Sequence, residues 1–421
     1  MSKKFDFVIF GASGFTGKYV CKELLNQVGD MNGRIALAGR SKKKLEDVLC
    51  WLTEDSSLSF DIDKIGFIIA NVDDSQSLLS MCKQSKIVLD CVGPYKFYGE
   101  AVVKACIDGG SDYVDITGEP EYIEMIMTKY HDAAVAKEVY IVSACGFDSI
   151  PSELGVIYAK RNFSGTLATV ENYFSTRVGP KGLGLNFGTY ASIVHISSNF
   201  DLLANLFARS SPPICGPELK QKNIHYDRRQ ETYAVPFLGA DPMLVRKSQQ
   251  FYSEKYNEIP LQFTMYLATS FARIIAIMLF GIILKIFTLT SWGTKLLLDH
   301  PKFFTAGVFS KEGPTEEQIA GSGFEFLMFC EGYKKQIDTD EFKAKNGSSD
   351  SLDAKMTVRI SGPEIAYVLT PIAVVQSAIA IAEERSKLPS NGGVYSPGPA
   401  FRDTKIIKKL HERGIKFEVL D

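Results

Sequence analysis

FDFVIFGASGFTG, residues 5–17, is the stretch that decides the fold. Its first six residues are apolar except Asp6, which is typical of a strand buried on both faces. Gly11, Gly14 and Gly17 follow at intervals of three, and a helical pattern begins directly after them. Glycine allows the tight turn and the close packing that such a junction requires. The stretch therefore predicts a buried strand, a glycine loop and a helix in direct succession.

The same alternation continues through the first part of the chain. Short β-branched runs recur at residues 34–38, 65–70, 87–91, 113–116 and 140–143, with helical patterns between them. Strands alternating with helices in this way are typical of βαβ units and a parallel sheet. We expect an α/β fold with a Rossmann-type doubly wound parallel sheet, whose ligand lies at the carboxyl ends of the strands.

The regularity weakens from Pro151 and returns near the C-terminus, where a strand over 356–360 and a helix over 371–384 are expected. We therefore divide the chain into three parts. Residues 1–150 form the Rossmann domain. An inserted α+β domain, residues 151–360, serves substrate binding or dimerisation in a homodimer. The last part, residues 361–421, packs back on the Rossmann domain.

Composition narrows the function. The 421 residues carry 47 Lys and Arg against 49 Asp and Glu, a net charge of −2, so the basic excess of a general nucleic-acid binder is absent. The eight cysteines include no C-x-x-C pair and the five histidines are dispersed, so no metal site is expected. The N-terminus has no signal-peptide pattern, and we expect a reducing compartment.

The glycine loop has the properties of a phosphate site. Glycines let backbone N–H groups approach a pyrophosphate, which also benefits from the positive end of the following helix dipole. The spacing is G-x-x-G-x-x-G, a variant of the usual dinucleotide fingerprint. A structural turn would look similar, but the position between first strand and first helix favours a dinucleotide. The predicted loop residues are Gly11, Ser13, Gly14, Phe15, Thr16 and Gly17.

The end of the second predicted strand indicates which dinucleotide binds. An NAD site normally has Asp or Glu there, whereas this chain has Arg40 and Ser41. A guanidinium can hold a 2′-phosphate through paired hydrogen bonds, so NADP is the expected cofactor. Asp73 and Gly93, after the third and fourth strands, are expected to contact it as well. Turn chemistry would also explain Asp and Gly at those two positions.

The motifs together resemble a known family. GASGFTG, AGR, DCVGPYKFYGE, YVDITGE, GFDSIPSELG and GGVYSPGPAF resemble the saccharopine dehydrogenase-like oxidoreductases over the whole chain. The resemblance implies an NADP-type Rossmann domain, an inserted domain with an open sheet, and C-terminal helices that return to the first domain. It also implies an association with lipid droplets and a distant similarity to bacterial trans-acting enoyl reductases. Activity on saccharopine does not follow from it.

Catalytic candidates lie on the predicted strand-end loops. Tyr95 could donate a proton and Asp148 could orient a group or contact substrate. Asp115, Glu119 and Ser149 are further polar candidates, although Asp115 and Glu119 would also serve as helix caps, and Asp148-Ser149 before Pro151 as a helix start. The chain has no Tyr-x-x-x-Lys pair, the signature of short-chain dehydrogenases.

An apolar segment interrupts the inserted domain. Residues 261–289 contain only two charges, Arg273 and Lys285, and the uncharged run between them is too short to span a bilayer. The sequence leaves two alternatives, a buried helix or a helix lying in a lipid surface. The family resemblance favours attachment to a lipid droplet or membrane.

Three functional hypotheses follow. The first is an NADP(H)-dependent oxidoreductase that reduces an apolar, lipid-derived substrate at the cytosolic face of a lipid droplet or membrane. The second is a catalytically inactive nucleotide-binding scaffold on lipid droplets. The third, reduction of an amino-acid adduct, requires arginines that bind carboxylates, for which Arg177, Arg246 and Arg402 are available.

Overall fold

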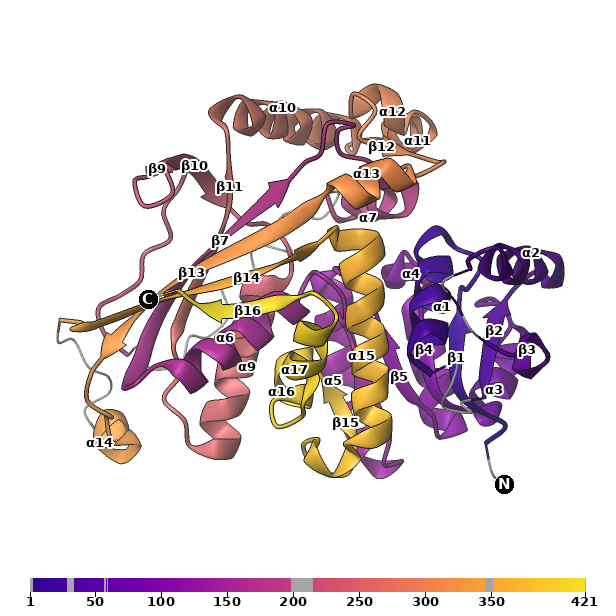
Figure 1. The fold of residues 1–421 in the computed structure, drawn as a ribbon, viewed down its shortest axis with the longest axis horizontal. Helices are drawn as coiled ribbons and strands as arrows, with labels where there is room; N and C mark the ends of the chain where they lie inside the picture. Colours follow the sequence, from indigo (N-terminus) through magenta and orange to yellow (C-terminus); the bar gives the residue numbers. More distant parts are fainter. Residues whose placement is uncertain are drawn as a thin grey trace. The chain divides into compact units, whose positions relative to one another are not determined.

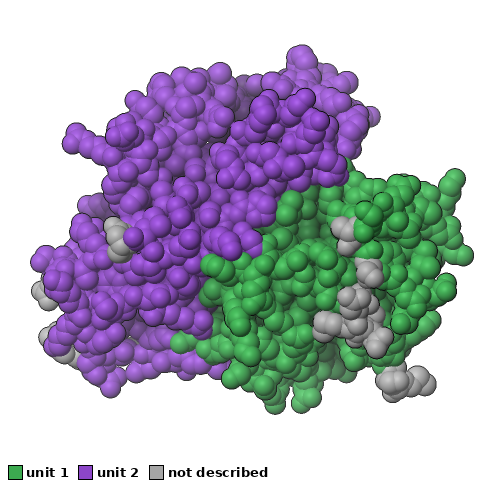
Figure 2. Space-filling model, viewed as in Figure 1, with its two compact units in different colours: residues 1–150, 365–413 green, residues 151–364, 414–421 purple. Residues whose placement is uncertain are grey.

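The chain forms two compact units in the computed structural model, which describes residues 3–28, 34–56, 58, 60–197, 215–344 and 351–420. Unit 1 contains residues 1–150 and 365–413, and unit 2 contains residues 151–364 and 414–421 (Figure 2). The chain therefore leaves unit 1, forms most of unit 2, and returns to unit 1 near its C-terminus.

Unit 1 is built on a parallel sheet of seven strands among the described residues, in the order β15-β6-β5-β4-β1-β2-β3. This order places β1 beside β4 at the centre, the reversal point of a doubly wound sheet. The predicted fold class is confirmed. The strands are β1 (Phe5–Phe10), β2 (Ile35–Gly39), β3 (Ile65–Ile69), β4 (Ser85–Asp90), β5 (Asp112–Asp115), β6 (Tyr140–Val142) and β15 (Gly393–Tyr395).

Helices connect these strands, as parallel neighbours require. In Figure 1 the connecting helices lie along the sheet of unit 1, with α15 beside it. The helices are α1 (Phe15–Val28), α2 (Lys42–Thr53), η1 (Ile62–Lys64), α3 (Ser75–Gln84), α4 (Tyr95–Gly109), α5 (Pro120–Ala136), η2 (Ile365–Leu369), α15 (Thr370–Glu383), η3 (Arg385–Lys387), α16 (Pro397–Phe401) and α17 (Ile406–Glu412).

The returning segment supplies a core helix. The helical run Ile365–Glu383 is long and apolar enough to cross a membrane, but 78% of its most apolar window is buried. It packs against α1, β4 and β5. The sequence suggested that all of residues 361–421 return to unit 1. In the structure, residues 361–364 and 414–421 belong to unit 2 instead. The terminal strand β16 (Lys416–Val419) pairs with β14 (Ala354–Pro363) and belongs to unit 2.

Unit 2 contains a mixed sheet in the order β16-β14-β13-β7-β11-β10-β9, in which β7 and β11 pair in parallel. Alternate residues of β13 are buried, which is the pattern of a sheet covered on one face. Gly155 of α6 (Ile150–Asn162) packs against Ile360 and Met328 on that face. The remaining strands of this sheet are β7 (Thr166–Arg177), β9 (His225–Asp227), β10 (Thr232–Pro236), β11 (Gln262–Thr269) and β13 (Gly323–Tyr333).

Helices α10 (Phe271–Phe287), α11 (Ser291–Asp299) and α12 (Pro301–Phe304) gather with α7 (Phe187–Ser197) at one end of this sheet (Figure 1). A small apolar cluster holds them together, with Tyr190, Leu284, Leu297 and Phe309 buried in it. The other elements of unit 2 are β8 (Leu185–Asn186), α9 (Asp241–Tyr256), β12 (Phe309–Ser310), α13 (Glu316–Gly321) and α14 (Thr339–Ala344).

Candidate functional site

The glycine loop joins β1 to α1 at the carboxyl edge of the sheet of unit 1. Gly11 has φ +83°, and a Cβ there would lie 2.8 Å from Val92 Cγ2. A Cβ on Gly17 would overlap the carbonyl oxygen of Gly11. Ser13 and Gly14 are exposed, so the loop presents its backbone to solvent beside the N-terminus of α1. Its close packing and open backbone fit a bound pyrophosphate.

Arg40 lies directly after β2 and is exposed, with no ion-pair partner among the described residues. The Ser41 hydroxyl caps α2 by accepting a hydrogen bond from the N–H of Lys44 at 3.4 Å. A Cβ on Gly39 would lie 3.7 Å from Ser13 Oγ, which brings the glycine loop close to the end of β2. Arg40 is therefore accessible, and its binding of a 2′-phosphate stays a prediction.

Asp73 and Gly93 both lie in turns at this edge. The N–H of Asp73 donates to Asn71 Oδ1 at 3.4 Å, and both Asp73 and Gly93 are exposed. A Cβ on Gly93 would meet the ring of Tyr95 at an ordinary 3.7 Å. The turn chemistry that the sequence suggested is therefore present, and contact of either residue with the cofactor stays a prediction.

Tyr95 opens α4 and is buried. Its hydroxyl donates to the carbonyl oxygen of Asp90 at 2.8 Å and accepts from the N–H of Ile116 at 3.4 Å. Burial, reinforced by the nearby carboxyls of Asp90 and Asp115, raises the pKa of Tyr95 well above its ordinary value. The phenol thus holds its proton against a backbone acceptor. Proton donation from Tyr95 to a substrate stays a prediction, and its observed contacts tie the ends of β4 and β5 together.

Glu119 caps a helix other than its own. Its carboxylate accepts from the N–H of Tyr95 at 3.0 Å and from the N–H of Lys96 at 2.8 Å, at the start of α4. The residue before α4 is Pro94, which makes no side-chain cap. A carboxylate at this end of a helix also interacts favourably with the helix dipole. These contacts give Glu119 a structural role in shaping the loop before α4.

Asp148 is the sequence candidate with the most available carboxyl. It lies after β6, against Gly118, and has no hydrogen-bond partner among the described residues. Burial raises the pKa of Asp148 to about 6. Its loop is held by Thr370, which accepts from the N–H of Phe147 at 3.1 Å and donates to the carbonyl of Ile365 at 2.8 Å. Burial thus favours the protonated form of this carboxyl, and a catalytic role for Asp148 stays a prediction.

Sequence reasoning missed three members of a buried network at the same edge, Asp90, Tyr113 and Tyr122. The Tyr113 hydroxyl lies 2.9 Å from Asp115 Oδ2 and 3.2 Å from Asp90 Oδ2. The signal was available, because Asp90 and Asp115 each end an apolar strand and the two strands are neighbours. An ionisable group at the buried end of a central strand requires a partner.

The three arginines considered for carboxylate binding are distributed over both units. Arg177 and Arg246 belong to unit 2, and Arg402 belongs to unit 1, where its Nε lies 3.7 Å from Asp403. Arg177 lines an open pocket of about 640 Å³ together with Arg359 and Glu325. These positions alone do not form a carboxylate site. Among the described residues no group of three or more His, Cys, Asp or Glu side chains could hold a metal ion.

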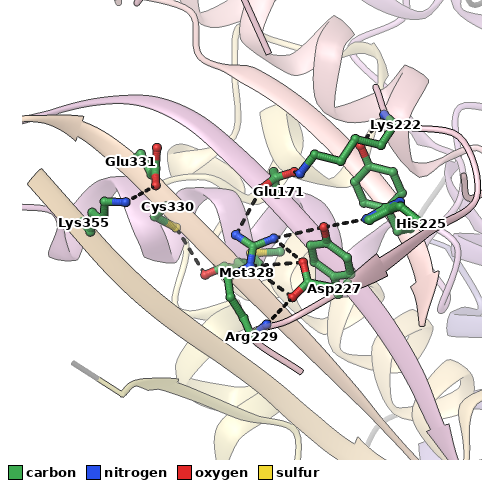
Figure 3. Close-up of polar contacts among 11 residues, drawn as sticks. Glu171, Lys222, His225, Asp227, Arg229, Met328, Cys330, Glu331 and Lys355 are labelled. Carbon is green, nitrogen blue, oxygen red and sulfur yellow. Dashed lines mark hydrogen bonds and ion pairs between the residues drawn. The ribbon is translucent and has the colours of Figure 1, made fainter. Parts of the chain in front are cut away.

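A second polar cluster lies on the sheet of unit 2 (Figure 3). Arg229 stacks 3.8 Å from the ring centre of Phe329, pairs with Asp227, and lies 3.0 Å from Glu171. Burial raises the pKa of Asp227, but hydrogen bonds from Arg229 and Tyr173 and the Arg229 charge outweigh it and lower this pKa to about 2. The His225 ring and the Tyr173 hydroxyl lie 3.1 Å apart. Lys222 pairs with Glu171 and Arg229 pairs with Asp227, so the charges compensate one another and the cluster fastens the β9–β10 hairpin to the sheet.

Comparison with known proteins identifies an NADP-binding domain in unit 1. The model of the saccharopine dehydrogenase NADP binding domain matches residues 7–142, which contain the glycine loop, Arg40 and Gly93. The apo saccharopine dehydrogenase (L-Glu forming) of Saccharomyces cerevisiae has a similar structure, with a TM-score of 0.54 and 10% identity. That match covers 99% of this chain and 100% of the yeast chain, and it supports the fold alone.

Relatives match over the full length. The human saccharopine dehydrogenase-like oxidoreductase is 39% identical, covering 99% of this chain and 98% of its own. An Arabidopsis thaliana relative named "Probable mitochondrial saccharopine dehydrogenase-like oxidoreductase" is 36% identical, covering 99% and 96%. The "Lipid droplet localized protein" of Caenorhabditis elegans is 32% identical, covering 99% and 98%. The chain belongs to the saccharopine dehydrogenase-like oxidoreductases, and unit 1 carries the NADP(H)-binding domain of that family.

Proposed function

We propose that this protein is an NADP(H)-dependent oxidoreductase that reduces an apolar, lipid-derived substrate while unit 2 is attached to the cytosolic face of a lipid droplet or membrane. The exposed apolar surface of α10 is the observation that carries the proposal. The cofactor, when bound, supplies hydride, and the chain supplies the site that holds it, an acid and the attachment to lipid.

Helix α10 exposes side chains that a protein in water normally buries. Only Ile274 and Leu284 of its 17 residues are buried. Met278 is 52% exposed, Leu279 56%, Ile282 54% and Ile286 59%. These positions recur at helical spacing and form one stripe. Of the two alternatives that the sequence left open, a helix buried in a core does not describe α10.

The apolar surface extends past the end of α10. Leu289 is 77% exposed, Trp292 72% and Phe303 81%. A continuous exposed apolar patch marks an interaction site, because each exposed Å² costs roughly 25 cal/mol relative to burial. Lys295 and Lys302 flank it, where ammonium groups could remain in the headgroup layer. A helix of 17 residues is about 25 Å long, which suits a helix lying in a surface better than one crossing it.

The relatives support a lipid surface without fixing the organelle. One is named for lipid droplets and another for mitochondria. The exposed apolar side chains of α10 suit an apolar interface bordered by polar headgroups, and both lipid droplets and mitochondrial membranes provide one. An enzyme fixed there would meet substrates that partition into the lipid phase, which is our reason for proposing a lipid-derived substrate.

A homodimer through unit 2 also stays a prediction, which sedimentation of the purified chain would test.

Flotation with phosphatidylcholine-coated triacylglycerol droplets tests the attachment. We expect the wild-type protein to float with the droplets. The variant Leu279→Gln/Ile282→Gln should bind at least about tenfold more weakly, because each apolar side chain transferred to lipid contributes about 1.5–3 kcal/mol. Leu238→Gln is the control, since Leu238 is 71% exposed and lies in unit 2 outside α10–α12. Equal loss in the control, or no flotation of the wild type, would contradict the proposal.

Substitution of Asp148 separates an enzyme from an inactive scaffold. If Asp148 donates a proton during reduction, its acid form is required, so the rate should fall as the pH rises through about 6. Asp148→Asn should lower the rate by about 10²–10⁴-fold and remove this pH dependence. The assay follows NADPH oxidation with enoyl and carbonyl lipids, with exposed Asp108→Asn as the control. A scaffold would show no turnover in any of these proteins.

A further inference from the structure

The buried network at the ends of β4 and β5 contains two carboxyls and one phenol between them. Asp90 and Asp115 are neighbours across the parallel pair, and both are fully buried. The Tyr113 hydroxyl reaches Asp115 Oδ2 at 2.9 Å, Asp90 Oδ2 at 3.2 Å and the Tyr122 hydroxyl at 3.2 Å. All of these residues belong to unit 1.

Counting hydrogens shows that this arrangement needs one more proton. A phenol has a single proton and can donate it to one carboxylate at a time. If both carboxyls were ionised, one carboxylate oxygen would face a lone pair of the phenol, with a second negative charge beside it. A proton on Asp90 removes both problems, because Asp90 then donates to Tyr113 and Tyr113 donates to Asp115.

The backbone decides which carboxyl keeps the proton. Asp115 Oδ1 accepts two backbone N–H groups, from Ala144 at 2.8 Å and from Thr117 at 3.1 Å. Asp90 Oδ1 accepts one, from Val92 at 2.9 Å. Hydrogen bonds to the ionised form favour ionisation, so the negative charge is better placed on Asp115.

The other groups near Asp90 do not offset a second charge. They are the thiols of Cys91 and Cys106 and the phenols of Tyr95 and Tyr122, contributed by the adjacent residue and by helices α4 and α5. On the opposite side β1 presents Phe10. Burial raises the pKa of Asp90 well above its ordinary value, and it raises the pKa of Asp115 to about 6.

We propose that Asp90 carries a proton in the folded protein and that the chain from Asp90 through Tyr113 to Asp115 positions the loops of the cofactor site. Asp90 holds the N–H of Val92, and the Val92 side chain packs where Gly11 has no Cβ. Asp115 holds the loops that follow β5 and β6. Asp90 is thus a positioning residue, and this inference does not depend on a lipid substrate or on attachment to lipid.

Asparagine at the two positions gives an asymmetric test. Asp90→Asn reproduces the protonated carboxyl, with an NH₂ that donates to Tyr113 and an oxygen that accepts from Val92. We expect it to retain NADPH affinity and to melt at or above the wild-type melting temperature at neutral pH. Asp115→Asn puts an NH₂ where Asp115 Oδ2 accepts from Tyr113, and it removes the charge that the two backbone N–H groups stabilise, so its melting temperature should fall. Equal loss in both variants, or greater loss in Asp90→Asn, would overturn the proposal.

Infrared spectra and the pH dependence of the melting temperature distinguish a protonated Asp90 from an ionised Asp90 with a merely structural role. At a pH well above about 6, the pKa of Asp115 and Asp148, the carbonyl band of a buried protonated carboxyl should be present in the wild type and absent in Asp90→Asn. An aspartic acid with a raised folded pKa stabilises the protein fully below its unfolded pKa, and this stability is lost as the pH rises through the folded pKa. The melting temperature of the wild type should therefore decline relative to Asp90→Asn as the pH rises above about 3.9, the ordinary pKa of aspartic acid. A constant difference, or an infrared band retained in Asp90→Asn, would refute a proton on Asp90.

Discussion

At the scale of single residues, Arg40 and the groups after the central strands have different kinds of role. Arg40 is exposed and available, whereas Tyr95 and Glu119 are engaged by backbone groups. The difference follows from position. Arg40 follows β2, which lies next to the edge strand β3, while β4 and β5 lie nearer the middle of the sheet, where each buried polar atom needs a partner.

Arg40→Ser should therefore weaken NADPH binding more than NADH binding. A charge-assisted hydrogen bond contributes about 1.5–3 kcal/mol, so we expect roughly a 10- to 100-fold loss of NADPH affinity. Titration followed by nicotinamide fluorescence measures both dissociation constants. Lys43→Ser is the control for a general loss of positive charge, because Lys43 is an exposed residue of α2. Equal weakening by the two substitutions would remove Arg40 from the 2′-phosphate site.

At the scale of elements, the same residue type has opposite roles in the two units. Gly17 lies where α1 meets the glycine loop, and no Cβ fits there. Gly281 lies in the exposed helix α10, and a Cβ there would meet nothing within 4 Å. Gly17 therefore serves packing, whereas Gly281 only makes α10 less stable than an alanine at that position would.

Substitution by alanine should separate these roles. Gly17→Ala should lower the melting temperature by several degrees and abolish tight NADPH binding, because the loop must shift away from its new Cβ. Gly281→Ala should stabilise the protein by at most about 1 kcal/mol and leave NADPH binding unchanged. Thermal denaturation with and without NADPH measures both effects. Stabilisation by Gly17→Ala would show that the loop is not tightly packed.

At the scale of the whole molecule, cofactor binding and the apolar surface belong to different units. Purified protein without lipid should self-associate through α10–α12, because an exposed apolar surface of this size favours association in water. Leu279→Lys/Ile282→Lys should restore a single smaller species and leave NADPH affinity unchanged. Light scattering after size-exclusion chromatography measures the first effect, and cofactor titration measures the second. Loss of NADPH affinity in this variant would show that the two functions are coupled.

Local sequence patterns were sufficient to predict most of the strands and helices of unit 1. The strand periodicity, the glycines of residues 11–17 and Arg40 after β2 act over short distances, so they can be read from the chain. Only the tertiary structure decided that α10 is exposed, since an apolar helix has the same sequence in a core and on a surface. It also decided that β16 joins unit 2, and that Asp90, Tyr113 and Asp115 meet. These outcomes depend on which strands become neighbours, and pairing between distant segments leaves little trace in local sequence.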